Sequence, residues 1–242
     1  MVTRRQFLVA SGTALAAFSL RAQESDSVPA VLDHILLGSA DVDAGITFVD
    51  QHLGVRAAFG GVHPGRGTQN ALLSLGDRHY LEIIAPDPKQ QGADISPMFR
   101  ADLIAHLRSL VTPRLVGWAA HPGSLDAFAK KLHQAAIAFH GPTPGSRKRP
   151  DGRLLQWQTL SLDDDQSGLL PFFIEWAADS PHPASDAPAG CSVAHFALAN
   201  PDPAALEKST TLLGLGVVTE KNEKSQIRAT LRGPKGHLDL TS

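Results

Sequence analysis

Three stretches of the chain open in the same way, with a short apolar strand followed by an amphipathic helix. The expected opening strands are residues 32–37, 115–120 and 193–198. In the segments that follow them, apolar residues recur every three or four positions, which is the spacing of one helix face. Internal repetition constrains the fold strongly, because each copy is expected to adopt the same supersecondary structure. The repeat therefore predicts one unit built three times.

Further runs of strand-forming residues follow each helix. The expected strands are Val55–Phe59, Asn70–Leu75 and Arg78–Ile84, then Arg153–Leu160 and Leu170–Trp176, then Val217–Glu220, Gln226–Leu231 and His237–Leu240. Together with the opening strand and the helix, these runs predict the order βαβββ for each unit. The expected fold class is α+β.

Two segments separate the units. Residues 87–112, with a helix-like stretch at Ala101–Leu110, lie between the first and second units, and the Pro- and Asp-rich segment Ala177–Gly190 precedes the third. We therefore expect a domain of two units at residues 31–178. A third, shorter βαβββ-like unit is expected at residues 191–242.

The first 22 residues have the pattern of a twin-arginine export signal. Arg4 and Arg5 precede Phe7, and an apolar run continues from there to Leu20. This run is too short for a stable membrane anchor, and the arginine pair distinguishes it from a general secretory signal. We expect cleavage after Ala22 and export of the folded protein to the periplasm or the extracellular space.

Composition excludes several classes of function. The chain has 22 Lys and Arg against 24 Asp and Glu, and loss of the signal removes Arg4, Arg5 and Arg21, which leaves 19 basic residues. This balance does not indicate a nucleic-acid partner. The one cysteine, Cys191, rules out an intramolecular disulfide. No later apolar stretch is long enough to cross a membrane, so no stable membrane anchor is expected after processing.

Chemically active residues recur at matching places in the units. The opening strands carry His34 in the first unit and His195 in the third, whereas the second has Gly117 there. The last strand of each unit places a carboxylate among apolar neighbours, and these carboxylates are Glu82, Glu175 and Asp239. An unpaired carboxylate is costly in a central strand. These positions therefore indicate functional residues rather than solvent-exposed surface charges.

Several stretches resemble motifs of the glyoxalase-like domain family, within the vicinal oxygen chelate superfamily. They are Leu32–His34, Gly60–Pro64, Gly67–Asn70, Tyr80–Glu82, Asp151–Trp157 and Pro171–Trp176. The resemblance covers residues 31–178 well and the third unit loosely. It implies that paired βαβββ units form curled mixed sheets around a concave pocket, with the helices outside.

The resemblance also implies a metal site. In the superfamily, the first and last strands of each unit supply the ligands, which here gives His34, Glu82 and Glu175, with Gly117 leaving one corner empty. Such donors suit a divalent ion such as Mn²⁺, Fe²⁺, Zn²⁺, Ni²⁺ or Mg²⁺. The expected function is a metal-dependent lyase, isomerase or dioxygenase acting on a small oxygenated substrate, with Glu82 and Glu175 as the catalytic residues.

Two alternatives remain open at this level. If the first unit pairs with the third, His34, Glu82, His195 and Asp239 form the ligand set. Because Gly117 supplies no ligand, the chain could instead be a metal-free protein that binds or sequesters a small molecule. The odd number of units leaves one without an internal partner, which predicts a homodimer if that unit pairs with a second chain.

Other candidates have simpler interpretations. The glycine-rich residues 60–67 join two strands and are expected to form a tight turn or a pocket lid. The charge run at residues 147–149 is expected in a loop, where it could receive an anionic substrate. His63, His121 and His140 are spare candidates. No Gly-x-Ser-x-Gly elbow indicates a serine hydrolase, and no base accompanies Cys191.

Overall fold

The computed structural model describes residues 28–76, 78–90, 101–149 and 151–242. The predicted signal at residues 1–22 lies outside this part of the chain. Within the described residues, no helix is long and apolar enough to span a membrane.

The first unit has the predicted order βαβββ. Its elements are β1 (Leu32–Gly38), α1 (Val42–Leu53), β2 (Ala58–His63), β3 (Thr68–Ser74) and β4 (Tyr80–Pro86). The side chain of Asp41 caps α1 by accepting a hydrogen bond from the backbone N–H of Ala44. Gly54 ends the helix with a φ of 80°, where a residue with a Cβ would be strained.

The second unit follows a separate helix, α2 (Ala101–Ser109). Its elements are β5 (Arg114–Ala120), α3 (Leu125–Gln134), β6 (Phe139–Lys148), β7 (Leu154–Leu162) and β8 (Phe172–Trp176). Sequence analysis missed β6, because Pro142 and Pro144 interrupt the strand pattern. This strand lies at the edge of its sheet, where proline is tolerated. The prediction of a loop at residues 147–149 is therefore wrong, since Arg147 and Lys148 belong to β6.

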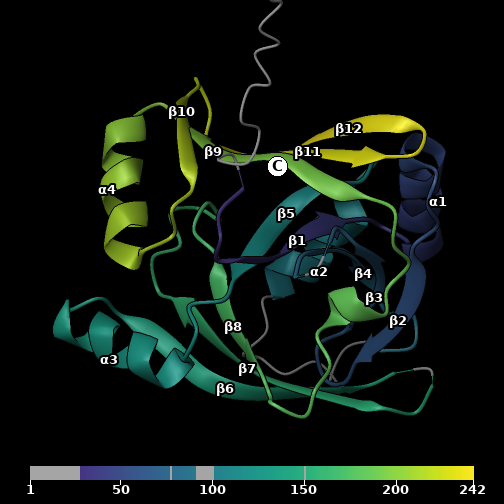
Figure 1. The fold of residues 1–242 in the computed structure, drawn as a ribbon, viewed down its shortest axis with the longest axis horizontal. Helices are drawn as coiled ribbons and strands as arrows, with labels where there is room; N and C mark the ends of the chain where they lie inside the picture. The colour runs from purple at the N-terminus through teal and green to yellow at the C-terminus, as the bar shows by residue number, and fades with distance from the viewer. Residues whose placement is uncertain (1–27, 77, 91–100, 150) are drawn as a thin grey trace, which may run out of the picture.

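The first two units share one eight-stranded mixed sheet, with the order β2-β3-β4-β1-β5-β8-β7-β6. Strands β1 and β5 pair antiparallel at its centre, with Ile35 opposite Trp118 and Leu36 opposite Gly117. Strand β4 runs parallel to β1, and β8 runs parallel to β5. The predicted α+β fold with a curled mixed sheet is confirmed (Figure 1).

The third unit forms a sheet of its own. Its elements are β9 (Ser192–Asn200), α4 (Pro203–Leu213), β10 (Val218–Lys221), β11 (Gln226–Gly233) and β12 (Gly236–Thr241), after the short 3₁₀ helix η3 (Pro183–Ser185). The elements follow the predicted order, but the strand order is β10-β9-β11-β12. The last strand is thus separated from the opening strand by β11, whereas in the first two units these strands are neighbours.

The outer face of the eight-stranded sheet carries the main hydrophobic core. Ile35 of β1 and Leu81 of β4 belong to it, together with residues of α1, α3 and the third sheet. Phe196 of β9 packs against Trp118 of β5, with ring centroids 5.0 Å apart. Figure 1 shows β9, β11 and β12 passing above β1 and β5. The apolar face of the third unit is therefore covered within the same chain.

The inner face of this sheet carries the polar residues of interest. Leu36 and Ile84 form a small cluster with Leu107 of α2 on this side, and Tyr80 packs against Ala184 of η3. Helix α2 and the segment around η3 therefore cover the inner face. Since side chains alternate along a strand, His34 and Glu82 lie on this face.

Candidate functional site

His34 and Glu82 lie side by side at the centre of the inner face. Strands β1 and β4 are paired, and His34 Nε2 is 3.3 Å from Glu82 Oε2. The imidazole stacks on Tyr80 at a centroid distance of 4.5 Å, and Phe172 meets it edge-on at 5.5 Å. The His34 side chain is only 2% exposed, so its position is fixed by packing.

Asp33 orients His34 from the other side. Its Oδ1 lies 2.7 Å from His34 Nδ1, and its Oδ2 lies 3.2 Å from both Trp176 Nε1 and His182 Nε2. Burial raises the pKa of Asp33, but the hydrogen bonds from His182 and His34 outweigh this effect and hold the pKa well below its ordinary value. The carboxylate is therefore ionised, and Nδ1–H of His34 donates to it.

Glu82 is held by neighbours on β2 and β3. Asn70 Nδ2 donates to its Oε1 at 2.8 Å, and His63 Nε2 lies 3.6 Å from the same oxygen. Burial raises the pKa of Glu82, but the charges of His34 and His63, the Asn70 hydrogen bond and the charge of Arg147 together lower it below its usual value. Glu82 is therefore ionised despite its burial.

At pH 7 His63 is neutral, because burial lowers its pKa to about 4, so its charge acts on Glu82 only in more acidic solution. Asn70 Nδ2 lies 3.2 Å from His63 Nε2, and His63 Nδ1 lies 2.9 Å from Thr68 Oγ1. These contacts fit the tautomer in which Nδ1–H donates to Thr68 and Nε2 accepts from Asn70. One of the spare histidine candidates thus belongs to the site.

Two arginines bring positive charge to the Glu82 side of the cluster. Arg147 reaches from β6 and donates through Nη1 to the backbone carbonyl of Gly60, and its side chain is nearly fully buried. Arg66 lies with its guanidinium 6.0 Å from the ring centroid of Trp157. Burial lowers the pKa of both arginines, and the charge of Glu82 opposes that effect.

The side chains of Asn70 and Arg147 both pack closely against the backbone of Gly60. A Cβ at this position would lie 2.5 Å from Asn70 Oδ1 and 2.9 Å from Arg147 Nη1, so a larger residue would collide with both. Among the described residues, Asn70 Oδ1 is buried without a hydrogen-bond partner. A buried acceptor of this kind is usually satisfied by a water molecule or a ligand. Asn70 Oδ1 is therefore an acceptor still available beside the carboxylate of Glu82.

The other predicted site residues lie elsewhere. Glu175 follows Ile174 on β8, and its Oε2 accepts a 2.7 Å hydrogen bond from the backbone N–H of Leu125, at the start of α3. Gly117 lies opposite Leu36, with open space where its Cβ would be. The structure thus brings together two members of the predicted set, His34 and Glu82, and does not place Glu175 with them.

The alternative ligand set is not assembled either. His195 lies in the third sheet, with its Nε2 3.2 Å from Oε1 of Glu220, and Asp239 accepts a hydrogen bond from Thr230. The physical reason is that β1 pairs with β5, so the third unit packs on the outer face, opposite to His34. The remaining spare candidates, His121 and His140, contact the carbonyl of Ile174 and the carboxylate of Asp163.

The described residues do not supply a preformed metal centre. No group of three or more His, Cys, Asp or Glu side chains among them is arranged to hold a metal ion. Both oxygens of Glu82 already face protein groups, and His34 Nδ1 is taken by Asp33. As they are placed, the predicted donors among the described residues therefore do not form a metal site.

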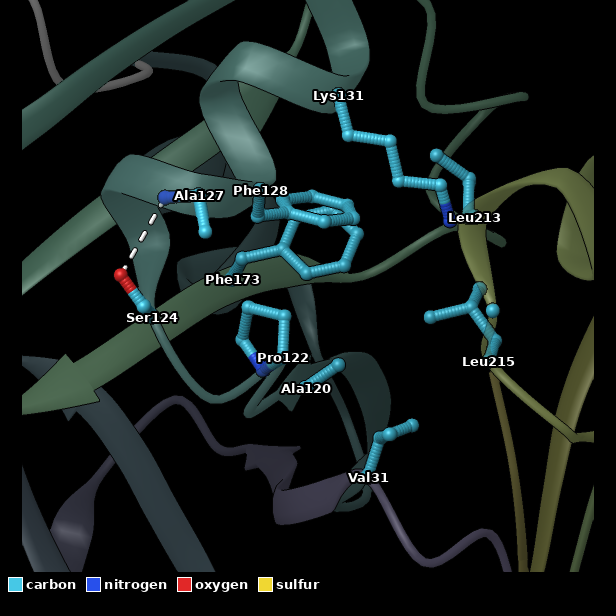
Figure 2. Close-up of a pocket in the computed structure, with 11 residues that line it drawn as sticks. Val31, Ala120, Pro122, Ser124, Ala127, Phe128, Lys131, Phe173, Leu213 and Leu215 are labelled. Atoms are coloured by element: carbon cyan, nitrogen blue, oxygen red, sulfur yellow. Dashed lines mark hydrogen bonds between the residues drawn. The ribbon is translucent and has the colours of Figure 1, made fainter.

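Two cavities lie outside this cluster. One of about 290 Å³ lies between α3 and the third unit, and Figure 2 shows its lining. The other, of about 300 Å³, runs along β7 and β8 and is lined in part by Glu175, Trp157 and Trp176. Within the cluster itself, the side chains of Glu82 and His63 are about one-tenth exposed, so solvent reaches it from their side.

The model of the family described as "Glyoxalase-like domain" matches residues 32–214, and the chain belongs to that family. The match extends beyond the first two units to the end of α4. No curated protein matches the chain in sequence.

Solved structures agree with this fold. A hypothetical protein from Staphylococcus aureus has a TM-score of 0.61 and 17% identity, over 87% of this chain and 84% of that one. Methylmalonyl-CoA epimerase from Mycobacterium tuberculosis has a TM-score of 0.42 and 18% identity, over 62% of this chain and 89% of that one. A methylmalonyl-CoA epimerase in complex with methylmalonyl-CoA and NH4+ has a TM-score of 0.44 and 19% identity, over 62% and 96%. The first of these comparisons supports the fold.

The neutral state of His63 predicts a loss of stability in acid. Its pKa is about 4 in the folded protein, against 6.5 for an ordinary histidine. Between these values the unfolded chain binds a proton that the folded protein does not, so stability falls as pH falls. Through His63, the free energy of unfolding should therefore decrease by about 3 kcal/mol as the pH falls across this range.

Urea denaturation at a series of pH values measures this effect. A His63→Gln variant should lose this part of the pH dependence, whereas His140→Gln, at a side chain that is 82% exposed, should keep it. The same pH dependence in the His63→Gln variant as in the unsubstituted protein would contradict the assignment.

Proposed function

We propose that the protein is an isomerase or lyase that moves protons on a small, anionic, oxygenated molecule. The observation that carries this proposal is the buried pair of His34 Nε2 and Glu82 Oε2, 3.3 Å apart. A carboxylate beside an imidazole provides a base and an acid within reach of one substrate. Membership of the glyoxalase-like domain family favours this class of chemistry.

Each member of the pair has a distinct role. Glu82, which is ionised, removes a proton from the carbon next to a carbonyl, and the doubly protonated imidazole of His34 gives its Nε2 proton to the carbonyl oxygen. Asp33 supports His34 by accepting from its Nδ1 at 2.7 Å, which directs Nε2 toward the substrate side. The product of this step is an enol, which is an enediol when the deprotonated carbon carries a hydroxyl. The proton from carbon is then on Glu82, and the proton on oxygen comes from His34.

The fate of the enediol decides between the two reactions. In an isomerisation, Glu82 returns the proton to the former carbonyl carbon, and the hydroxyl on the other carbon gives its proton to Nε2 of His34. In an elimination, the enol hydroxyl returns its proton to Nε2 of His34, and the bond between the adjacent carbon and the leaving group breaks. The leaving group departs with the proton held by Glu82. Both outcomes use the same first proton transfer, so the pair of residues is needed in either case.

The positive charge of the site favours an anionic substrate. Arg147 and Arg66 both interact electrostatically with Glu82. Asn70 Oδ1, which is buried without a hydrogen-bond partner among the described residues, can accept a hydrogen bond from a substrate hydroxyl. A small hydroxy acid or keto acid presents both groups, a carboxylate for arginine and a hydroxyl for the amide oxygen.

A binding role is the second candidate. The enclosure of His34 and the absence of a ligand side chain at Gly117 favour a protein that holds a small molecule without converting it. Both roles require that the positive charge of Arg147 and Arg66 attracts an anion, and only the enzyme requires proton transfer.

The exchange of a carbon-bound proton separates these two roles. Small hydroxy and keto acids are incubated with the protein in D₂O, and deuterium uptake next to the carbonyl is followed by NMR. Glu82→Gln should slow the exchange by about 10²–10⁴-fold, because it removes the base and keeps the shape. Glu207→Gln, an exposed glutamate on α4, is the matched control. Binding of these acids without exchange in the unsubstituted protein would favour the binding role.

Metal dependence, which the family resemblance predicts, has its own test. Protein purified without chelators is analysed for bound metal beside a His34→Ala variant. Stoichiometric metal in the unsubstituted protein and its loss in the variant would restore the metal-dependent mechanism. Absence of metal from both, with exchange activity retained, is the result that the acid–base proposal predicts.

We propose that the protein is exported by the twin-arginine route. The support is the adjacent pair Arg4 and Arg5 before the apolar run that begins at Phe7. Replacing both arginines by lysine keeps the charge and removes the motif, so the protein should accumulate inside the cell. Cell fractionation checks this, and efficient export of the variant would contradict the proposal.

A further inference from the structure

The cavity between α3 and the third unit lies on the side of the sheet away from His34. Figure 2 shows Phe128 and Phe173 on one side of it and Leu213 and Leu215 on the other. The two phenylalanine rings pack against each other, with centroids 4.3 Å apart. Phe172, the residue before Phe173, contacts His34 instead. Strand β8 therefore separates this cavity from the candidate active site.

The walls of the cavity are apolar at the bottom and polar at the rim. Ala120, Phe173 and Leu215 are at most 2% exposed, while Ser124 and Lys131 are exposed. A volume of about 290 Å³ has room for roughly ten water molecules at their liquid volume. Water against apolar walls lacks hydrogen-bond partners, so an apolar group that replaces it gains free energy.

The charge at this cavity has one sign. Among the described residues that line it, Lys131 alone is charged. Figure 2 shows its side chain extending across the opening toward Leu213, and its Nζ would be 3.8 Å from a Cβ on Gly214. Ser124 accepts a hydrogen bond from the backbone N–H of Ala127, and its hydroxyl can also donate to a ligand. The rim therefore suits an acidic group.

We propose that this cavity is a second ligand site, which binds a small carboxylate with an aromatic or medium-length alkyl body. The apolar body lies between the Phe128–Phe173 pair and Leu215, and the carboxylate lies at Lys131. Its size agrees with that of small-molecule pockets, which begin at about 300 Å³. The proposal does not depend on the reaction at His34 and Glu82.

Naphthalene-2-carboxylate is a suitable probe, because it combines a flat apolar body with one carboxylate. Its binding to the full chain is measured by calorimetry, beside the uncharged naphthalene-2-methanol. Lys131→Met removes the charge and keeps most of the apolar stem. It should weaken binding of the carboxylate by about two- to fivefold, as expected for an exposed ion pair. The alcohol should bind equally to both proteins.

Lys130→Met is the matched control, since Lys130 is the neighbouring lysine on α3 and does not line the cavity. It should leave the affinity for the carboxylate unchanged. A second variant, Ala127→Trp, fills the rim at an exposed helix position and should reduce binding of both probes at least tenfold, with its fold checked by circular dichroism.

The proposal would be overturned by no binding of the carboxylate to the unsubstituted protein. Equal effects of Lys131→Met and Lys130→Met, or full binding to a folded Ala127→Trp protein, would overturn it as well. Loss of binding on Glu82→Gln substitution would also overturn it, because that result places the probe at the other site.

Discussion

The antiparallel pairing of β1 with β5 is the interaction on which the rest of the structure depends. It joins two βαβββ units into one sheet and gives the alternating side chains of β1 two different environments. Ile35 and Leu37 enter the core with α1 and the third sheet, whereas His34 and Leu36 lie under α2 and the η3 segment. A slip of one residue would exchange these faces and bury the wrong side chains, so the hydrophobic pattern fixes the register.

A second constraint is the burial of charge on the inner face. Asp33 and His34 are adjacent and both 2% exposed, and the irregular register between Leu32 and His34 lets β1 accommodate both. Each charged group there has a partner, since His34 contacts Asp33 and Glu82, and Asn70 donates to Glu82. Such a network is costly to disturb, because removing one member leaves another buried without its partner. The same contacts that satisfy these charges also orient them for proton transfer.

Sequence periodicity predicted the repeated units of strands and helix, because these strands must bury apolar residues. The family resemblance implied that units pair and that His34 and Glu82 share one site. Periodicity could not predict the position of the Glu175 side chain. That carboxylate accepts a hydrogen bond at the start of α3, from a residue 50 positions away in the sequence. Periodicity also missed β6, where prolines obscured an edge strand, and with it the burial of Arg147. The third unit has the predicted order of elements but a different strand order, and strand order is set by packing between units. Asp33 and Asn70 were present in the family motifs, yet only the folded chain shows what they contact.

The most direct measurement is a double-variant cycle on His34 and Glu82, read by deuterium exchange into a small hydroxy or keto acid that the unsubstituted protein exchanges. If the two residues act as one acid–base unit, His34→Gln, Glu82→Gln and the double variant should all lose about the same activity, because either loss disables the pair. If the losses multiply in the double variant, the residues act independently, and the pair cannot be the unit that carries the reaction.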